Sequence, residues 1–223
     1  IPPVRGRLKP AGRLRLQRAH GVFALAPVIP VITIDDLEDA LPMARALVDN
    51  GLKVLEVALR TPVALDAIER IATEVPDACV GAGTVLDLVG LKASIRAGAR
   101  FAISPGATEA LYDTAQYADI PLIPGIATAS ELMRGLERGW RRFKFFPAES
   151  SGGVAALKGF AGPFAQARFC PTGGIDATKA PAYLALPNVA CVGGSWMLPA
   201  DALKAKDWNR IGDLAREAAA LGH

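Results

Sequence analysis

The sequence predicts an α/β protein whose single domain is a (β/α)₈ barrel of the TIM type. Eight apolar runs with the composition of β-strands recur at a mean spacing of about 23 residues, and each is followed by a stretch with apolar residues at helical intervals. Parallel strands need a crossover helix between them, and closing eight such units into a barrel leaves no sheet edge exposed. The chain length of 223 residues also suits one such domain.

The expected elements alternate along the chain. The strands are short runs rich in Val, Ile, Leu, Ala and Phe, at residues 27–33, 53–59, 78–83, 100–104, 120–124, 142–147, 167–171 and 188–193. The helices are amphipathic stretches at residues 36–49, 62–75, 86–97, 108–118, 129–138, 153–160, 176–186 and 200–221. Gly51, Gly98, Gly139 and Gly162 fall just after helical stretches, where glycine can end a helix in the left-handed conformation at low cost.

The main alternative is a doubly wound open sheet, which usually carries a glycine-rich nucleotide-binding loop. The segment Gly81-Ala-Gly-Thr-Val-Leu86 lacks the third glycine of the dinucleotide-binding fingerprint, and no Gly-Lys-Ser/Thr loop occurs. No Pro/Ser-rich linker divides residues 27–221. We therefore expect one barrel domain over residues 27–223, preceded by a basic leader or poorly ordered segment over residues 1–26.

The basic residues are concentrated at the N-terminus. Six of them precede Asp35, the first acidic residue, and these are Arg5, Arg7, Lys9, Arg13, Arg15 and Arg18. Removing these six charges from the net charge of +3 leaves the rest of the chain at −3. A nucleic-acid surface needs Lys and Arg clustered on folded elements with aromatic residues among them, so we expect no nucleic-acid partner.

Several features indicate a cytoplasmic protein. The leader and the apolar run at 21–34 have the outline of a signal peptide, but Pro27 and Pro30 interrupt the run, which suits the first barrel strand better. No run of 18 apolar residues occurs elsewhere, so no membrane association is expected. Cys79, Cys170 and Cys191 are odd in number and lie in apolar runs, as is typical of reduced thiols in a cytoplasmic protein.

Histidine is nearly absent, which restricts the chemistry. The two histidines are His20, in the leader, and His223, the last residue. The core therefore offers no histidine for a metal site or for general-base catalysis. We expect neither a metal nor an organic cofactor.

Lys144 is the strongest candidate for a catalytic residue. It lies inside the strand Arg142-Phe-Lys-Phe-Phe146, where strand alternation puts Lys144 and Phe146 on one face and the other two phenylalanines on the opposite face. Burial disfavours the charged ammonium, so the neutral amine, a nucleophile, becomes accessible. The alternative is a structural lysine that pairs with a carboxylate or extends its ammonium to the barrel mouth.

The second expected strand carries two charged residues on one face. In Val54-Leu-Glu-Val-Ala-Leu-Arg60, Glu56 and Arg60 share the same parity, with Arg60 nearer the C-terminal mouth, where barrels place their chemistry. If that face is the interior, Glu56 can approach Lys144 across the barrel. A buried ion pair without catalytic function is the alternative.

Small and hydroxyl residues end several strands at the same mouth. The third strand ends at Gly81-Ala-Gly-Thr84, which presents a hydroxyl above small residues. The seventh ends at Thr172-Gly-Gly174 and the eighth at Gly193-Gly-Ser195. Paired glycines let backbone N–H groups approach an anion, and barrels usually bind phosphate after strands seven and eight. Plain turns are the alternative interpretation.

These motifs together resemble the class I 2-keto-3-deoxy-6-phosphogluconate (KDPG) aldolases, including those that also cleave 4-hydroxy-2-oxoglutarate. The resemblance covers about residues 27–220 and runs through seven segments in order. They are Leu55-Glu-Val-Ala-Leu-Arg-Thr61, Val80-Gly-Ala-Gly-Thr-Val85, Phe101-Ala-Ile-Ser-Pro-Gly106, Pro121-Leu-Ile-Pro-Gly-Ile126, Phe143-Lys-Phe-Phe-Pro-Ala-Glu149, Arg168-Phe-Cys-Pro-Thr-Gly-Gly-Ile175 and Val192-Gly-Gly-Ser-Trp196. Family members generally have a short helix before the first strand, where this chain has its Arg-rich segment.

The resemblance implies a role for each matched residue. Lys144 forms the Schiff base and Glu56 is the general acid/base. The other implied residues bind substrate: Arg60 and Thr84 at the pyruvyl carboxylate, Pro105 and Phe146 packed on the substrate, and Thr172, Gly173, Gly174, Gly193, Gly194 and Ser195 around the phosphate. The implied substrate is a phosphorylated 2-keto-3-deoxy sugar acid, pyruvate is a product, and the implied assembly is a homotrimer.

The expected reaction is cleavage of KDPG to pyruvate and D-glyceraldehyde 3-phosphate. Breaking a C–C bond beside a hydroxyl requires an electron sink, and a protonated imine on Lys144 supplies one without a metal. Three alternatives remain at this point. They are an aldolase for the galactonate epimer, a phosphosugar isomerase or synthase that uses Glu56 as base and Lys144 as an electrostatic group, and a barrel that binds phosphoanions without catalysis.

Overall fold

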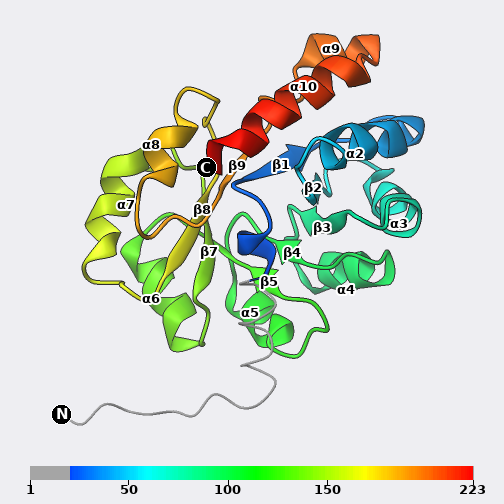
Figure 1. The fold of residues 1–223 in the computed structure, drawn as a ribbon. Helices are drawn as coiled ribbons and strands as arrows, with labels where there is room; N and C mark the ends of the chain where they lie inside the picture. The colour runs from blue at the N-terminus through cyan, green and yellow to red at the C-terminus, as the bar shows by residue number, and fades with distance from the viewer. Residues whose placement is uncertain (1–20, 223) are drawn as a thin grey trace, which may run out of the picture.

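The strands form a closed ring with helices around it in the computed structural model, which describes residues 21–222 (Figure 1). The strands are β1 (Val28–Ile32), β2 (Val54–Ala58), β3 (Cys79–Gly83), β4 (Ala102–Ile103), β5 (Leu122–Ile123), β6 (Gly125–Ile126), β7 (Arg142–Phe145), β8 (Arg168–Pro171) and β9 (Val192–Gly194). Strand pairs within these residues are parallel, in the orders β5-β4-β3-β2-β1-β9 and β6-β7-β8. The predicted (β/α)₈ barrel is confirmed.

The ring of strands is irregular at two places, between β5 and β6 and between β8 and β9. Pro124, the last residue of the expected fifth strand, separates β5 from β6, which lies just beyond the expected end, because proline has no N–H with which to continue a ladder. Its carbonyl still accepts a hydrogen bond from the Lys144 N–H at 2.9 Å. On the other side, isolated parallel bridges link Phe169 to Val189 and Thr172 to Gly193, and the second joins the end of β8 to β9. The ends of β8 and β9 therefore lie side by side at the mouth.

The helices follow the strands as predicted, with one exception. They are α2 (Ala40–Val48), α3 (Ala64–Glu74), α4 (Leu88–Arg96), α5 (Glu109–Ala115), α6 (Ala129–Glu137), α7 (Gly153–Ala161), α8 (Ala180–Leu184), α9 (Ala200–Ala205) and α10 (Trp208–Ala219), with 3₁₀ turns at Leu37–Asp39 and Ala220–Gly222. The expected helix 200–221 is broken between α9 and α10. Lys206 there is left-handed, with φ of 53°, and the Asp207 side chain caps α10 by accepting from the Arg210 N–H.

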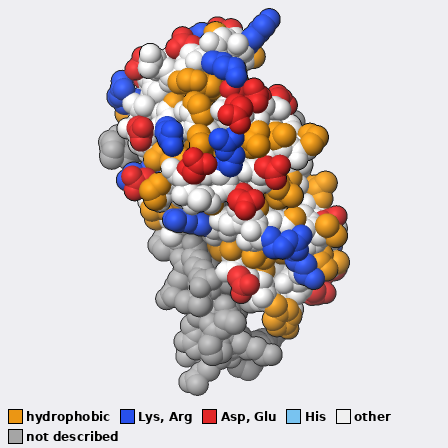
Figure 2. Space-filling view, turned by 90° about the vertical axis from the view of Figure 1, so that its right-hand side faces the viewer, with side chains coloured by type: hydrophobic (Ala, Val, Ile, Leu, Met, Phe, Trp, Pro, Cys, Tyr) orange, Lys and Arg blue, Asp and Glu red, His pale blue; other side chains and the backbone are white. Residues whose placement is uncertain are grey.

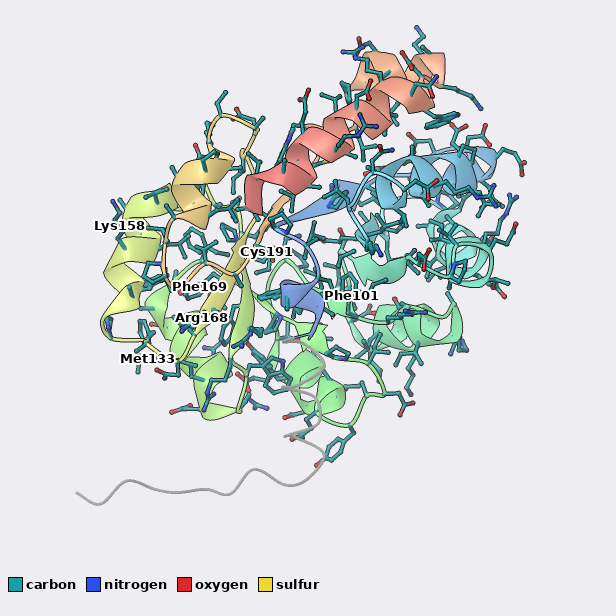
Figure 3. The ribbon with its side chains drawn as sticks, in the orientation of Figure 1. Phe101, Met133, Lys158, Arg168, Phe169 and Cys191 are labelled. Carbon is teal, nitrogen blue, oxygen red and sulfur yellow. The ribbon has the colours of Figure 1, made fainter. Side chains whose placement is uncertain are left out.

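The core has two layers, one outside and one inside the ring. Alternation along β2 sends Leu55 toward the helices and Val54 into the barrel, and both are fully buried. The interior layer also contains Phe101 and Cys191, which lie near the centre of the ring, whereas Met133 lies at its outer edge (Figure 3). Packing on both faces explains why the strands are almost continuously apolar.

Packed residues begin before the expected domain boundary at residue 27. A helical turn at 21–24 precedes β1, and Val22, Phe23 and Ala26 are buried against the interior layer. These residues therefore belong to the barrel core rather than to a leader. The rest of the expected leader, residues 1–20 with His20, lies outside the described residues, as does His223. Within residues 21–222, no helix combines the length and apolar composition needed to cross a lipid bilayer.

Candidate active site

Lys144 lies inside the barrel, on the strand face opposite Phe143 and Phe145, and this separation of faces is the one that strand alternation predicts. Phe143 and Phe145, its neighbours on β7, point outward into the helix layer, so the lysine side chain is directed to the interior and is 4% exposed. Its ammonium nitrogen lies 5.2 Å from the centre of the Phe146 ring. The amine is thus buried inside the barrel, beside an aromatic ring.

Glu56 meets Lys144 across the interior. The Lys144 Nζ donates to Glu56 Oε1 at 2.8 Å, although the two residues are 88 positions apart in the sequence. The Glu56 residue is 1% exposed, so both members of the pair are buried. A carboxylate at hydrogen-bond distance from an amine can accept its proton directly and return it later.

Gly83 makes the space that Glu56 occupies. Gly83 lies at the end of β3, which pairs with β2 through Ala58. A Cβ on Gly83 would lie 2.6 Å from the Glu56 Cγ and still closer to Oε1. From the sequence alone, Gly81 and Gly83 indicate only small residues near the mouth. The signal for this packing was present, because alternate glycines in a strand open space on one face.

Arg60 and Thr84 stand together at the mouth. The Arg60 Nε donates to Thr84 Oγ1 at 3.2 Å. Thr84 has φ of 57°, an uncommon conformation for a β-branched residue, and the hydrogen bonds Leu59 N–H to Gly83 O and Val85 N–H to Ile103 O hold the backbone on each side of it. The bond uses one of the five guanidinium donors, so the Arg60 terminal nitrogens can bind a carboxylate in two-point fashion.

Pro105 and Phe146 are half-buried where β4 and β7 end. The Pro105 carbonyl packs so closely on Gly125 that a side chain at Gly125 would collide with it. The Phe146 ring lies beside the Lys144 amine. The structure thus brings both residues to the mouth that contains Lys144, Arg60 and Thr84.

The glycine pairs after β8 and in β9 differ from each other. Gly173 and Gly174 form a loop with φ of 107° and 78°, which glycine adopts without strain. Gly193 and Gly194 belong to β9 and are buried, and side chains there would collide with Thr172 Oγ1 and the Trp196 ring. The second pair is therefore required for close packing beside Thr172. Ser195 follows it and is exposed.

The loop after β8 is oriented by the loop after β7. The Ala148 N–H donates to Thr172 O at 2.8 Å and the Glu149 N–H donates to Gly173 O at 3.1 Å. In a trans peptide the N–H points opposite to the C=O. The N–H groups of Gly173 and Gly174 therefore point away from the β7 side and toward β9, where Ser195 follows. Consecutive N–H groups aimed the same way can bind an anion.

Two thiols lie inside the barrel near Glu56. Burial raises the pKa of the Cys191 thiol well above its ordinary value, and the nearby Cys170 and Glu56 add to the effect. A neutral Cys191 does not compete with the amine as a nucleophile. Across residues 21–222, no group of three or more His, Cys, Asp or Glu side chains is placed to bind a metal ion.

The chain matches known proteins over most of its length. Residues 20–214 match the family described as KDPG and KHG aldolase. The KHG/KDPG aldolase of Escherichia coli (strain K12) is 58% identical over 200 residues, which cover 90% of this chain and 94% of that protein.

The chain therefore belongs to the KDPG and KHG aldolase family. The resemblance inferred from its sequence motifs is confirmed. A solved family structure, the KDPG aldolase from Legionella pneumophila with pyruvate captured at low pH as a covalent carbinolamine intermediate, is 52% identical and has a TM-score of 0.89. The superposition covers 90% of this chain and 98% of that one. A 2-dehydro-3-deoxy-phosphogluconate aldolase from Dickeya dadantii is 58% identical and covers 91% of this chain and 95% of its own.

Proposed function

We propose that this chain cleaves KDPG to pyruvate and D-glyceraldehyde 3-phosphate through a Schiff base on Lys144, and that it also cleaves 4-hydroxy-2-oxoglutarate to pyruvate and glyoxylate. One observation carries the proposal. A buried amine lies 2.8 Å from a buried carboxylate inside the barrel of a KDPG and KHG aldolase family member. The carbinolamine in the Legionella aldolase supports it, because a carbinolamine with pyruvate is the adduct that precedes an imine.

The first half of the reaction builds the electron sink. Glu56 takes a proton from the Lys144 ammonium, and the neutral amine attacks C2 of the keto acid. The proton held by Glu56 then leaves with the carbinolamine hydroxyl as water, which produces the protonated imine and restores the Glu56 carboxylate. The 2.8 Å separation lets one carboxyl group serve both transfers without movement of the backbone.

The second half breaks the carbon–carbon bond. The Glu56 carboxylate removes the proton from the C4 hydroxyl, the C3–C4 electrons move into the C2–C3 bond, and the imine becomes a neutral enamine. D-Glyceraldehyde 3-phosphate leaves. The Glu56 carboxyl then protonates C3, and hydrolysis of the resulting imine releases pyruvate and regenerates the Lys144 amine.

The mouth supplies substrate positioning. Arg60, fixed by its bond to Thr84, binds the carboxylate of the pyruvyl half and so orients the imine plane relative to Glu56. Pro105 and Phe146 pack against the substrate chain. The N–H groups of Gly173 and Gly174, with Ser195 and the neighbouring Thr172, Gly193 and Gly194, receive the phosphate.

The pyruvate–borohydride trap tests this proposal. Incubation with pyruvate and borohydride should add one reduced pyruvyl group at Lys144, located by peptide mapping. Lys144→Arg should abolish the adduct and the turnover, because a guanidinium cannot form the imine. Lys53→Arg is the matched control, since Lys53 is an exposed lysine just before β2, and it should leave both unchanged. Wild type that turns over KDPG without any lysine adduct would contradict the proposal.

The same experiment separates the alternatives. A phosphosugar isomerase or synthase that uses Lys144 electrostatically would keep activity in Lys144→Arg, whereas an imine-forming enzyme would not. A barrel that only binds phosphoanions would turn over no keto-acid phosphate. Comparison of kcat/KM for KDPG and for its galactonate epimer distinguishes the two aldolases.

The remaining partner and location assignments are also proposals. Family membership supports a homotrimer, which light scattering tests. The three free cysteines support a cytoplasmic location. On the face that Figure 2 presents, basic and acidic side chains are interspersed with hydrophobic ones rather than gathered into a field of one sign. That pattern supports the expectation of no nucleic-acid partner on this face.

A further inference from the structure

A charged cluster lies behind the glycine loop that follows β8, outside the residues given a role so far. It consists of Glu149 from the loop after β7, Lys179 before α8, and Tyr183 on α8. The Tyr183 hydroxyl donates to Glu149 Oε1, and the Lys179 ammonium lies 3.0 Å from Glu149 Oε2. The cluster thus ties together the two loops that follow β7 and β8.

The cluster also contacts the glycine loop directly. The Lys179 Nζ donates to Gly174 O at 2.8 Å. The stem of Glu149 packs on Gly174, because a Cβ there would lie 2.8 Å from the Glu149 Cγ. Glu149 therefore contacts both glycines: its N–H donates to Gly173 O and its stem packs on Gly174. Its carboxylate holds Lys179, which in turn donates to Gly174 O.

The charges are arranged to hold this geometry. The hydrogen bond from Tyr183 and then the one from Lys179 lower the pKa of Glu149, and the bond to Glu149 raises the pKa of Lys179. Tyr183 is 1% exposed, so its hydroxyl is a fixed donor on the buried side of the carboxylate. The Lys179 ammonium is therefore committed to Glu149 and to the Gly174 carbonyl.

We infer that Glu149, acting through Lys179, is a positioning residue that fixes the peptide following Gly174, and with it the shape of the glycine loop, for binding the substrate phosphate. The Gly173 carbonyl is held by the Glu149 N–H and the Gly174 carbonyl by Lys179, so the N–H groups that share those two peptides, those of Gly174 and Ile175, must point the other way. The inference rests on the proposed function, since it assumes that the phosphate binds at this loop. Its consequence is selective: the residue matters for phosphorylated substrates and not for the chemistry at Lys144.

Glu149→Gln tests the inference because it keeps the shape and an acceptor for Tyr183 but removes the charge that holds Lys179. We expect kcat/KM for KDPG to fall about fivefold, mainly through KM, on the scale of one weakened charge-assisted hydrogen bond. The value for 4-hydroxy-2-oxoglutarate, which has no phosphate, should stay unchanged. The inhibition constant of inorganic phosphate, measured with that second substrate, should rise in parallel with the KM for KDPG.

Two further variants keep the test decisive. Lys179→Met removes the donor to Gly174 O and should show the same split between the substrates. Asp213→Asn, which breaks the exposed ion pair between Asp213 and Arg216 on α10, is the matched control and should change neither substrate.

Three outcomes would overturn the inference. They are equal losses for both substrates in Glu149→Gln, no loss for either, and tighter binding of KDPG, which would mean that a released Lys179 pairs with the phosphate. A separate measurement on the wild type tests whether the phosphate binds at this loop at all. If it does not, the wild type would show the same KM for KDPG and for unphosphorylated 2-keto-3-deoxygluconate.

Discussion

The packing of Glu56 on Gly83 predicts that one added methyl group will separate Glu56 from Lys144. In Gly83→Ala the new Cβ would lie 2.6 Å from the Glu56 Cγ. Carbon atoms in contact prefer separations of about 3.5 Å or more, so the carboxylate must retreat by about 1 Å. Both Gly83 and Glu56 are buried, and the Gly83 backbone conformation is one that alanine tolerates, so the side chain of Glu56 is the part that moves.

The displacement is large enough to break the contact with Lys144. A retreat of about 1 Å from the present 2.8 Å takes the pair beyond hydrogen-bond distance. A misplacement of about 1 Å in a reacting group can cost about a hundredfold in rate, so we expect kcat to fall by about that factor. Insertion of a methyl group into a packed core should also lower the free energy of unfolding by about 1–3 kcal/mol.

The assay is pyruvate release from KDPG, coupled to lactate dehydrogenase, with urea unfolding on the same preparations. Gly159→Ala is the control, because Gly159 lies in α7 with open space around it. This variant should keep wild-type kcat and gain stability by about 0.5–1 kcal/mol, as expected for Gly to Ala in a helix. Wild-type kcat in a folded Gly83→Ala would refute the reasoning that the position of Glu56 limits turnover.

Three further predictions follow from the site and its surroundings. Glu56→Gln should lower kcat for KDPG by about 10²- to 10⁴-fold, measured in the same coupled assay, because the proton transfers lose their base. The pKa of Glu149 is lowered from its ordinary value of 4.5, so its contribution to stability is present above that pH and is lost as the pH falls below it. The urea midpoint of unfolding should therefore fall with acid more steeply in the wild type than in Glu149→Gln. Equal slopes of the two urea midpoints against pH would contradict this. Dialysis against EDTA should leave kcat unchanged, and a loss restored by a divalent cation would show that a metal takes part.

Some differences between the predicted and observed elements have a visible local cause. The separation of β5 from β6 follows from Pro124, and the Pro-Gly pair there could have indicated it. The break between α9 and α10 could not be found from periodicity, because the apolar spacing continues through it. At the break Lys206 is left-handed, and its ammonium pairs with Asp36 and Asp39 from the distant turn after β1.

The N-terminal boundary of the barrel domain is a second feature that local sequence patterns did not predict. Basic composition suggested that the segment before residue 27 would not pack, yet Val22 and Phe23 fill the barrel interior. Val22 and Phe23 lie in a continuous apolar run that begins at residue 21, and such a run has no helical or strand period to show which residues are buried. Their burial depends on the interior space that the closed ring of strands provides.

The order of elements, the barrel, and the strand faces on which Lys144 and Glu56 lie were determined by the sequence, because strand alternation and helical periodicity are local properties of the chain. Which of those faces points into the barrel was decided by the tertiary structure. The tertiary structure alone decided that these two residues meet at 2.8 Å, that Gly83 makes room for the carboxylate, and that Glu149 lies against Gly174. Such contacts join segments far apart in sequence, and their distances depend on strand register and barrel closure, which no local pattern records.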